Sequence, residues 1–427
     1  MKPTLVISCP ASSRSGYGDH SRDLIRSLIA MDKFIVKVMD QRWGNCAQTA
    51  LSIKDIDIVS RMLTANLDAK PDIWIQVTIP NEFSPVGNFN IGITAGIETT
   101  LCSAEFLEGV NRMNYVIVPS VHAKDVFENT SYDKKDQHGN IIQQLKCTTK
   151  IDVLFEGLDL EVFNKQPSTT FNLDTIKEDF AFLFVGHWMQ GEFGHDRKDV
   201  GGMIRTFLET FKDSAKRNQP ALILKTSSAT FSIIDREQVL QKIEQIKLSM
   251  GIDPALLPNI YVVHGDLSQA ELNNLYNHTK VKAMISFTHG EGFGRPLLEF
   301  SITGKPVIYS NWSGHIDFLS KYQVPLAGEI KQVHKSVVQP QLILENSGWF
   351  FVDYGYAIGV LKDVHKNYKK YLEQTRKQTQ YVKDNFSLDK MTKDFTDLID
   401  TNVPVVVVPQ TNIMSNEAIA ELALQEI

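Results

Sequence analysis

Two glutamates stand eight residues apart in the segment Glu291-Gly-Phe-Gly-Arg-Pro-Leu-Leu-Glu299, and no other segment of the chain is as informative about chemistry. The apolar run 283–287 before it predicts a short interior strand. Gly292 and Gly294 then free the backbone to bring its amides close to a ligand. Each carboxylate offers two acceptor oxygens, which fit a pair of neighbouring hydroxyl groups. Glu291 in the turn and Glu299 about one helical turn further on would reach different parts of one extended ligand.

A helix is predicted directly after this turn, with Pro296 in its first turn and Gly304 at its end. Its N-terminus leaves unpaired N–H groups and a partial positive charge, which suit a phosphate or a sugar oxygen. Two glutamates at this spacing are, taken alone, more often a capping residue and a solvated helix residue. The continuation to Asp317 changes that interpretation, because it adds a second strand and a second polar turn with Ser313 and Gly314. Together the two turns indicate a site for a sugar nucleotide.

At these residues the chain resembles the retaining glycosyltransferases of the GT4 type, including the phage-type members. That family carries the run E-G-F-G-x-x-x-x-E, then G-x-P-V-I, then a G-x-x-E turn. Residues 291–299, 304–308 and 314–317 are similar to these three motifs, with Asp317 in place of the last Glu.

Three further segments are similar to the family, so that the resemblance spans about the whole chain. Residues 156–163 resemble the N-G-V-D-x-x-x-F segment that precedes the domain linker. The strand 182–186, followed by Arg197 and Lys198, resembles the strand and basic turn that hold the donor diphosphate. Residues 15–18 resemble the glycine-rich loop after the first strand.

The resemblance implies the GT-B architecture, an α/β fold of two facing Rossmann-like doubly wound domains with the donor in the cleft between them. It implies Glu291, Lys198 and Arg197 as catalytic residues, with Lys198 the first choice to stabilise the departing diphosphate. Two adjacent cations at a helix start are disfavoured unless an anion is near, which supports that role. The implied donor-binding set is Gly16, Gly18, Gly186, Lys198, Gly292, Phe293, Gly294, Arg295 and Glu299. The donor is a substrate, and neither a cofactor nor a metal is expected.

The chain departs from the family in the segments that would face the donor. After Gly186 it has His187 where the family often has Arg, and the turn that follows is longer than usual. Where many members have a donor-facing His, Thr94 or Glu98 could contact the sugar, although a buried, structural Glu98 explains the sequence equally well. The other candidates for sugar or acceptor contacts are His122, His289, Ser313 and Gly314. A lone His is more often a satisfied polar residue than a catalyst.

The length of 427 residues suits two domains. Apolar strand-like runs alternate with amphipathic helical runs, which predicts parallel sheets built from βαβ units. The polar segment 164–170 has no strand pattern and is the expected linker. We therefore expect an N-terminal acceptor-side domain over residues 1–165, a C-terminal donor-binding domain over 166–385, and a tail over 386–427 that packs back on the body.

The composition, with 43% hydrophobic and 22% charged residues, is that of a soluble globular protein. No apolar run approaches the ~18 residues that span a bilayer, and no signal-peptide layout is present, so a cytoplasmic location is expected. The four cysteines lie far apart, which indicates neither a zinc site nor a disulfide framework. The net charge of −6 does not indicate nucleic acid as a partner, although a local basic groove would be compatible with it.

Two other patterns are assigned no chemistry. Asp55 and Asp57 have the spacing with which some glycosyltransferases hold a divalent cation, but the stretch 51–63 has amphipathic helical periodicity. We interpret the two carboxylates as its solvated face. The apolar side of that helix would consist of Ile53, Ile56, Val59 and Leu63. Gly16 and Gly18 lack the third small residue of a dinucleotide fingerprint, which argues against a nicotinamide-dependent oxidoreductase.

Three functions stay open. The leading one is a metal-independent, retaining transfer of a hexosyl or pentosyl group from a nucleoside-diphosphate sugar. The second is a GT-B epimerase or hydrolase of sugar nucleotides, and the third is a catalytically silent protein that binds sugar nucleotides or glycans. The acceptor could be a glycan, a lipid, a small molecule, a protein or a modified nucleic-acid base, because the loops 41–45 and 81–85 carry no signature. The sequence specifies neither the donor sugar and base nor the oligomeric state.

Overall fold

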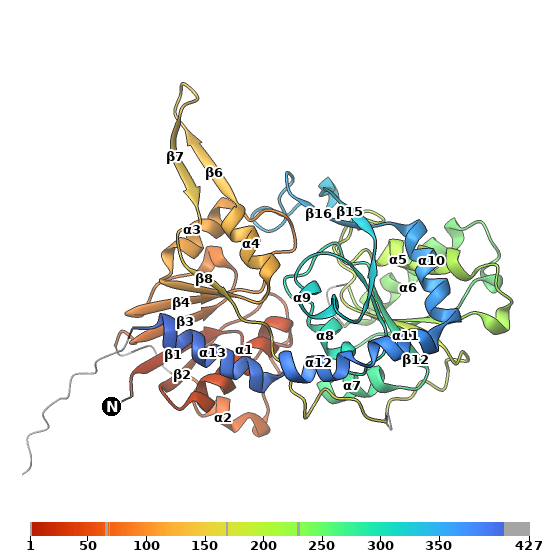
Figure 1. Ribbon diagram of the computed structural model, residues 1–427, viewed down its shortest axis with the longest axis horizontal. Helices are drawn as coiled ribbons and strands as arrows, with labels where there is room; N and C mark the ends of the chain where they lie inside the picture. Colours follow the sequence, from red (N-terminus) through yellow and green to blue (C-terminus); the bar gives the residue numbers. More distant parts are fainter. Residues whose placement is uncertain (1, 65–66, 68, 168–169, 229–230, 405–427) are drawn as a thin grey trace, which may run out of the picture.

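Two parallel six-stranded sheets, one in each half of the chain, form the frame of the protein in the computed structural model (Figure 1). The structure describes residues 2–64, 67, 69–167, 170–228 and 231–404. The strand orders are β2-β1-β3-β4-β5-β8 and β11-β10-β9-β12-β13-β14. In both sheets the order reverses beside the first strand of the domain, which is the doubly wound arrangement that the sequence predicts.

The first domain buries its sheet between helices because its strands are apolar on both faces. The strands are β1 (Thr4–Cys9), β2 (Ile35–Asp40), β3 (Ile73–Val77), β4 (Phe89–Ile93), β5 (Tyr115–Val118) and β8 (Ile151–Val153). The helices are α1 (Gly16–Met31), α2 (Ile56–Val59), α3 (Ala104–Arg112) and α4 (Val121–Asn129), with 3-10 turns η1 (Ile53–Asp55) and η2 (Pro80–Glu82).

The second domain repeats this plan. Its strands are β9 (Ala181–Val185), β10 (Ala221–Lys225), β11 (Ile260–Val263), β12 (Val281–Ser286), β13 (Val307–Ser310) and β14 (Val324–Leu326). Its helices are α5 (Val200–Phe211), α6 (Ile233–Ser249), α7 (Gln269–Asn277), α8 (Arg295–Ser301), α9 (Ile316–Leu319), α10 (Tyr354–Lys366), α11 (Tyr368–Thr375) and α12 (Gln378–Asn385). Its 3-10 turns are η3 (Lys216–Asn218), η4 (Pro254–Leu256) and η5 (Lys335–Val337).

The chain returns to the first domain at its last described helix, α13 (Leu388–Asn402), which lies along α1 (Figure 1). Met391, Phe395 and Ile399 of α13 belong to the apolar core beneath the first sheet. Helix α13 thus completes the helical layer on one face of the first domain. The valine-rich run 403–409, which was expected to pack on the body, lies almost entirely outside the described residues.

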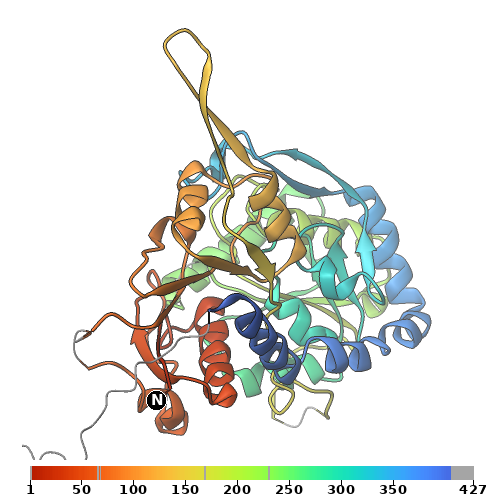
Figure 2. The ribbon, with the colours of Figure 1, turned by 60° about the vertical axis from the view of Figure 1, so that its left-hand side comes forward.

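Two antiparallel pairs of strands are not predicted by the sequence analysis. The hairpin β6 (Ser131–Lys135) and β7 (Ile141–Lys146) projects from the first domain into solvent (Figures 1 and 2). Apart from Tyr132 and Leu145, its strand residues are exposed, so they show no alternation of apolar and polar side chains to reveal a strand. The second pair, β15 (Gly328–Gln332) and β16 (Gly348–Val352), lies beside the second sheet.

The predicted amphipathic helix over 51–63 is wrong. The chain forms only the turn η1 and the one-turn helix α2 there. Ile53, Ile56 and Val59, which were expected to be buried, are 86%, 58% and 41% exposed, and Ile58 is the buried residue. An amphipathic stretch is stabilised as a helix mainly when its apolar face packs on the body, and here the residues at that spacing are exposed, so the apolar spacing misleads.

Candidate functional site

Glu291 lies among cations in the loop that follows β12. Lys198 Nζ donates a hydrogen bond to its Oε1, and Arg197 Nη1 lies 3.3 Å from its Oε2. Arg197 also lies 3.5 Å from the carboxylate of Glu98, which comes from the loop after β4 in the other domain. Two cations and two carboxylates from the two domains therefore form one balanced cluster.

Charge, more than burial, decides the state of Glu291. Burial alone would raise its pKa, but Lys198 and Arg197 lower the pKa to about 2. The pKa of Lys198 is lowered by burial, against the opposing effect of Glu291. Burial would lower the pKa of Arg197, but Glu98 and Glu291 raise it. Glu291 is thus a carboxylate throughout the neutral range.

The basic turn is held by the start of α5. Asp199 caps this helix with φ of 46°, and its carboxylate accepts a first-turn backbone N–H at 3.1 Å and the Tyr354 hydroxyl at 2.7 Å. Lys198 therefore stands directly before a helix N-terminus, where a cation needs a nearby anion. Glu291 is that anion. A Cβ at Gly186 would lie at an ordinary 3.6 Å from the Lys198 side chain.

The glycines around Glu291 allow the two domains to touch. A Cβ at Gly292 would lie 1.7 Å from the carbonyl oxygen of Ala95, and one at Gly290 would lie 1.9 Å from that of Glu98. Such close approach of two backbones requires glycine. Gly294 is needed for a different reason, because it caps α8 with φ of 95°. Gly292, which is predicted to bring the backbone close to a ligand, lies against the backbone of the first domain.

The second polar turn supports the first. Ser313 Oγ accepts the Glu291 N–H at 2.9 Å, and the Gly314 N–H donates to the Glu291 carbonyl oxygen at 2.9 Å. Asp317 follows this turn. Its carboxylate accepts the N–H of Val121, at the start of α4, at 2.9 Å. This turn therefore fixes the backbone of Glu291 and contacts the first domain as well.

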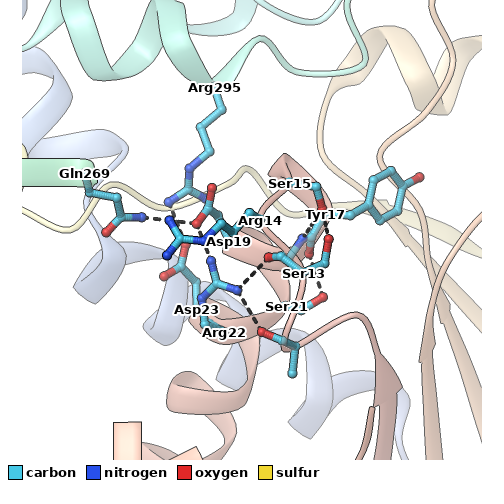
Figure 3. A network of polar contacts seen from close by, with 12 residues as sticks. Ser13, Arg14, Ser15, Tyr17, Asp19, Ser21, Arg22, Asp23, Gln269 and Arg295 are labelled. Atoms are coloured by element: carbon cyan, nitrogen blue, oxygen red, sulfur yellow. Dashed lines mark hydrogen bonds and ion pairs between the residues drawn. The ribbon is translucent and has the colours of Figure 1, made fainter. Parts of the chain in front are cut away.

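Glu299 has very different surroundings. Its Oε1 lies 3.3 Å from Arg295 Nε, and its Oε2 accepts the Tyr276 hydroxyl at 3.2 Å. It is 5% exposed, and burial raises its pKa to about 8 against the opposing charge of Arg295. Arg295 reaches out of the second domain to Asp23 on α1, 2.8 Å away (Figure 3).

The glycine-rich loop before α1 faces the same region (Figure 3). Ser15 caps α1 by accepting the Gly18 N–H at 3.1 Å. A Cβ at Gly16 would meet nothing within 4 Å, whereas a Cβ at Gly18 would lie 2.1 Å from a carbonyl oxygen of its own loop. Gly16 is thus open to a ligand, and Gly18 serves packing. The Tyr17 hydroxyl lies 3.2 Å from Thr94 Oγ1, which places Thr94 beside this loop.

The remaining candidates have the contacts of structural residues. His122 packs edge-on against Trp312 at 4.6 Å between ring centroids. His289 stacks on Trp349, and its ring nitrogens lie 2.6 Å and 3.2 Å from two backbone carbonyl oxygens. Burial lowers the pKa of both histidines to about 4. Phe293 lies in the apolar core of the second domain.

Several side chains at the site were missed by sequence reasoning. Trp43 stacks on Tyr17 with ring centroids 4.0 Å apart, and Tyr276 bonds to Glu299. His315 is buried in the second polar turn and lies close enough to Glu291 to influence its pKa. The position of His315 inside a motif was an available signal. The sequence carried no signal for Trp43, because the loop of Trp43 and Tyr17 come together only when the chain folds.

A metal site is not evident in the described part of the chain, where no group of three or more His, Cys, Asp or Glu side chains is arranged to hold an ion. Asp55 and Asp57 form ion pairs with Arg26 at 2.7 Å and 3.1 Å. Within the same residues, no helix has the length and apolar character that a bilayer crossing requires.

Comparison with solved structures shows the fold. The chain is similar to HepE of Anabaena, solved in complex with UDP and glucose, with 10% identity, a TM-score of 0.58, and coverage of 93% of this chain and 100% of that one. It is similar to a glycosyltransferase of Rickettsia africae at 13% identity and TM-score 0.60, covering 95% and 100% of the two chains. Sucrose-phosphate synthase of Thermosynechococcus elongatus gives 12% identity, TM-score 0.57, and coverage of 94% and 99%.

No protein-family model matches the chain, and no curated protein matches its sequence. The likeness over nearly the full length of these glycosyltransferase structures shows that the chain has the GT-B fold, with two Rossmann-like domains.

Proposed function

We propose that the chain is a metal-independent, retaining glycosyltransferase of the GT4 type that uses a nucleoside-diphosphate sugar, with a UDP-sugar as the first donor to test. The observation that carries the proposal is the pairing of Lys198 and Arg197 with Glu291 at the C-terminal edge of a parallel sheet, facing the loops of a second domain. Ligands of doubly wound folds bind at this edge. HepE, which has the same fold, is solved with UDP and with UDP and glucose, which supports the choice of donor.

In this proposal the bound donor replaces the ion pairs that Glu291 makes with Lys198 and Arg197. The diphosphate becomes the anion beside Lys198 and Arg197, and Glu291 is released to accept hydrogen bonds from sugar hydroxyls. As the glycosidic bond breaks, the leaving diphosphate gains negative charge, and cations held in place favour that state over the bound donor. Glu299 accepts the ribose diol, and the open backbone at Gly16 faces the phosphates or the acceptor.

A sugar-nucleotide epimerase or hydrolase is the second candidate, since it would use the same cleft without an acceptor. A silent binding protein is the third. In this proposal the acceptor binds to the first domain, whose loop after β4 places Glu98 3.5 Å from Arg197.

The decisive experiment is mass spectrometry of the chain incubated with UDP-, GDP-, ADP- and dTDP-sugars, each with and without a panel of acceptors. Transfer that depends on an acceptor supports the proposal, whereas brisk turnover without acceptor supports the epimerase or hydrolase. Binding of a donor without turnover in either setting would leave the silent protein. Lys198→Ala serves as the inactive control, and Lys212→Ala, at the far end of α5, is the matched control.

A further inference from the structure

Arg295 is the first residue of α8 and lies among carboxylates of both domains. It is 7% exposed. Its Nη2 lies 2.8 Å from Asp23 Oδ2 on α1, and its Nη1 lies 3.7 Å from Glu156 Oε2 in the segment after β8. Its Nε lies 3.3 Å from Glu299 Oε1, one helical turn further along α8. One guanidinium thus joins three carboxylates that lie up to 276 residues apart in the sequence.

The cluster around Arg295 has more acidic side chains than basic ones. Asp19 on α1 is a fourth carboxylate, which pairs with Arg22 and accepts a hydrogen bond from Gln269 of the second domain at 3.2 Å (Figure 3). Burial and Arg295 together lower the pKa of His20 to about 3, so its ring contributes no charge near neutral pH. Four acidic side chains therefore surround the guanidiniums of Arg22 and Arg295, and burial also raises the pKa of Glu156 to about 7. Of these two arginines, Arg295 pairs with residues of both domains.

We propose that Arg295 is a positioning residue that holds Glu299 in place for the donor ribose and couples that contact to closure of the two domains through Asp23 and Glu156. The inference rests on the proposed function, which assigns the ribose to Glu299. Arg295 lies beside Glu299 Oε1, and Glu299 Oε2 accepts the Tyr276 hydroxyl at 3.2 Å. With one donor on each oxygen, the plane of the carboxylate is fixed, and each oxygen keeps acceptor capacity for one hydroxyl of a diol.

Closure is coupled because Arg295 belongs to the second domain and Asp23 to the first. Separating the domains to admit a nucleotide must break this pair and leave Asp23 and Glu156 without Arg295, which stays beside Glu299 on α8. The three carboxylates share the cation only in the closed arrangement. A nucleotide that engages Glu299 therefore binds to the same group that Arg295 stabilises in the closed arrangement.

The arrangement also makes nucleotide binding depend on pH. Burial raises the pKa of Glu299 to about 8, Arg295 lowers it, and Asp19 raises it. Only the ionised carboxylate accepts hydrogen bonds at both oxygens. Nucleotide affinity should therefore increase as the pH rises through about 8, and the midpoint should follow the charges on Arg295 and Asp19.

The test is calorimetry over roughly pH 6 to pH 10, with whichever of UDP, GDP, ADP and dTDP the wild type binds most tightly. Arg295→Gln should weaken binding by about tenfold to a hundredfold at neutral pH and move the midpoint upward. Arg295→Lys should recover part of the affinity, because it keeps the charge without the planar fork. Asp19→Asn should move the midpoint downward. Arg26→Gln, a matched change on α1 outside this cluster, should leave binding unchanged.

A second measurement addresses closure. Small-angle scattering should show a larger radius of gyration for nucleotide-free Asp23→Ala than for the wild type, with saturating nucleotide reducing the difference. Equal radii without nucleotide would overturn the coupling.

Glu299→Gln separates failure of this inference from failure of the proposed function. Wild-type affinity in Glu299→Gln would remove the ribose assignment on which the inference rests. Weak binding by Glu299→Gln together with wild-type affinity and midpoint in folded Arg295→Gln would overturn the role of Arg295 alone. If Arg295→Gln fails to fold, Arg295→Lys and Asp19→Asn decide, and unchanged midpoints in both would overturn the inference.

Discussion

The two glutamates of one nine-residue segment lie in opposite electrostatic surroundings. Glu291 is contacted by two cations, and its pKa falls to about 2. Glu299 shares a single guanidinium with other carboxylates, and its pKa rises to about 8. Both side chains are almost fully buried, so burial alone does not explain the difference. The difference between the two pKa values follows from the number of cations beside each carboxylate.

This contrast suits two different tasks. A carboxylate that stays ionised across the neutral range can orient a sugar under all working conditions. A carboxylate whose ionisation is finely balanced can gain or lose its charge when a ligand, a proton or the other domain changes its surroundings. The comparison can be tested by removing the charged groups around one glutamate at a time.

The largest effect is expected when a cation is removed from the Glu291 cluster. Lys198→Ala should lower kcat by about 10²–10³-fold, the scale seen when one oriented charge-stabilising donor is lost. The loss should appear mainly in kcat because the charge on the diphosphate develops in the transition state. Lys198→Arg should recover little, since a guanidinium differs in shape from an ammonium group.

Steady-state kinetics of folded protein, with Lys212→Ala as control, would measure this effect. Wild-type kcat in Lys198→Ala would mean that Lys198 only neutralises Glu291, and would move the diphosphate contact to Arg197.

The next effect is a difference between the two glutamates themselves. Above about pH 8, where Glu299 is ionised, Glu299→Gln should weaken nucleotide binding by on the order of 1.5–3 kcal/mol, because the diol loses a charged acceptor. Glu291→Gln should not weaken nucleotide affinity, because it removes the carboxylate that competes for Lys198 and Arg197. It should depress turnover, because the proposed contact of Glu291 is with the sugar. Calorimetry with the nucleoside diphosphate and kinetics with the donor sugar distinguish the two outcomes. Equal losses of nucleotide affinity in both variants would remove the distinction.

The sequence was sufficient for the frame of this site but not for the contrast within it. Runs of apolar residues predict the parallel strands, because a strand buried on both faces reads as a continuous apolar segment. The basic turn and the two glutamates are short-range patterns, and the resemblance implied that they meet. Arg295 and Asp23 meet only when the domains pack together. The sequences of α1 and α8 contain no local pattern that predicts this ion pair.

The same limit explains the glycines. The sequence shows that Gly292 frees the backbone, but not what approaches it. The structure places the carbonyl oxygen of Ala95 there, from a loop almost two hundred residues earlier. Contacts between domains are set by three-dimensional packing, and a single sequence contains no periodic signature of them.

A smaller effect is expected on stability. Folding raises the pKa of Glu299 from an ordinary 4.5 to about 8, so ionising it destabilises the folded state as the pH rises through that window. Each unit by which folding raises a pKa corresponds to about 1.4 kcal/mol. Glu299→Gln should therefore become more stable relative to the wild type between about pH 5 and pH 8 in urea unfolding. Glu291 has the opposite sign: its contribution is present above pH 4.5 and is lost as the pH falls toward about 2. A stability difference between Glu299→Gln and the wild type that is flat with pH would contradict the raised pKa.

The smallest effect, none at all, is expected when divalent cations are removed. Lys198 and Arg197 supply positive charge beside the proposed diphosphate site, which is the part that a metal ion would otherwise take. The carboxylates with metal-binding spacing, Asp55 and Asp57, are paired with Arg26 instead. Turnover in excess EDTA should therefore equal turnover in untreated enzyme, with Lys198→Ala assayed in parallel, because a metal could partly replace the missing cation in that variant. If wild-type turnover is lost in EDTA and returns with Mg²⁺ or Mn²⁺, the two cations beside Glu291 do not suffice to hold the diphosphate. Arg26→Gln would then test whether Asp55 and Asp57 hold the metal ion.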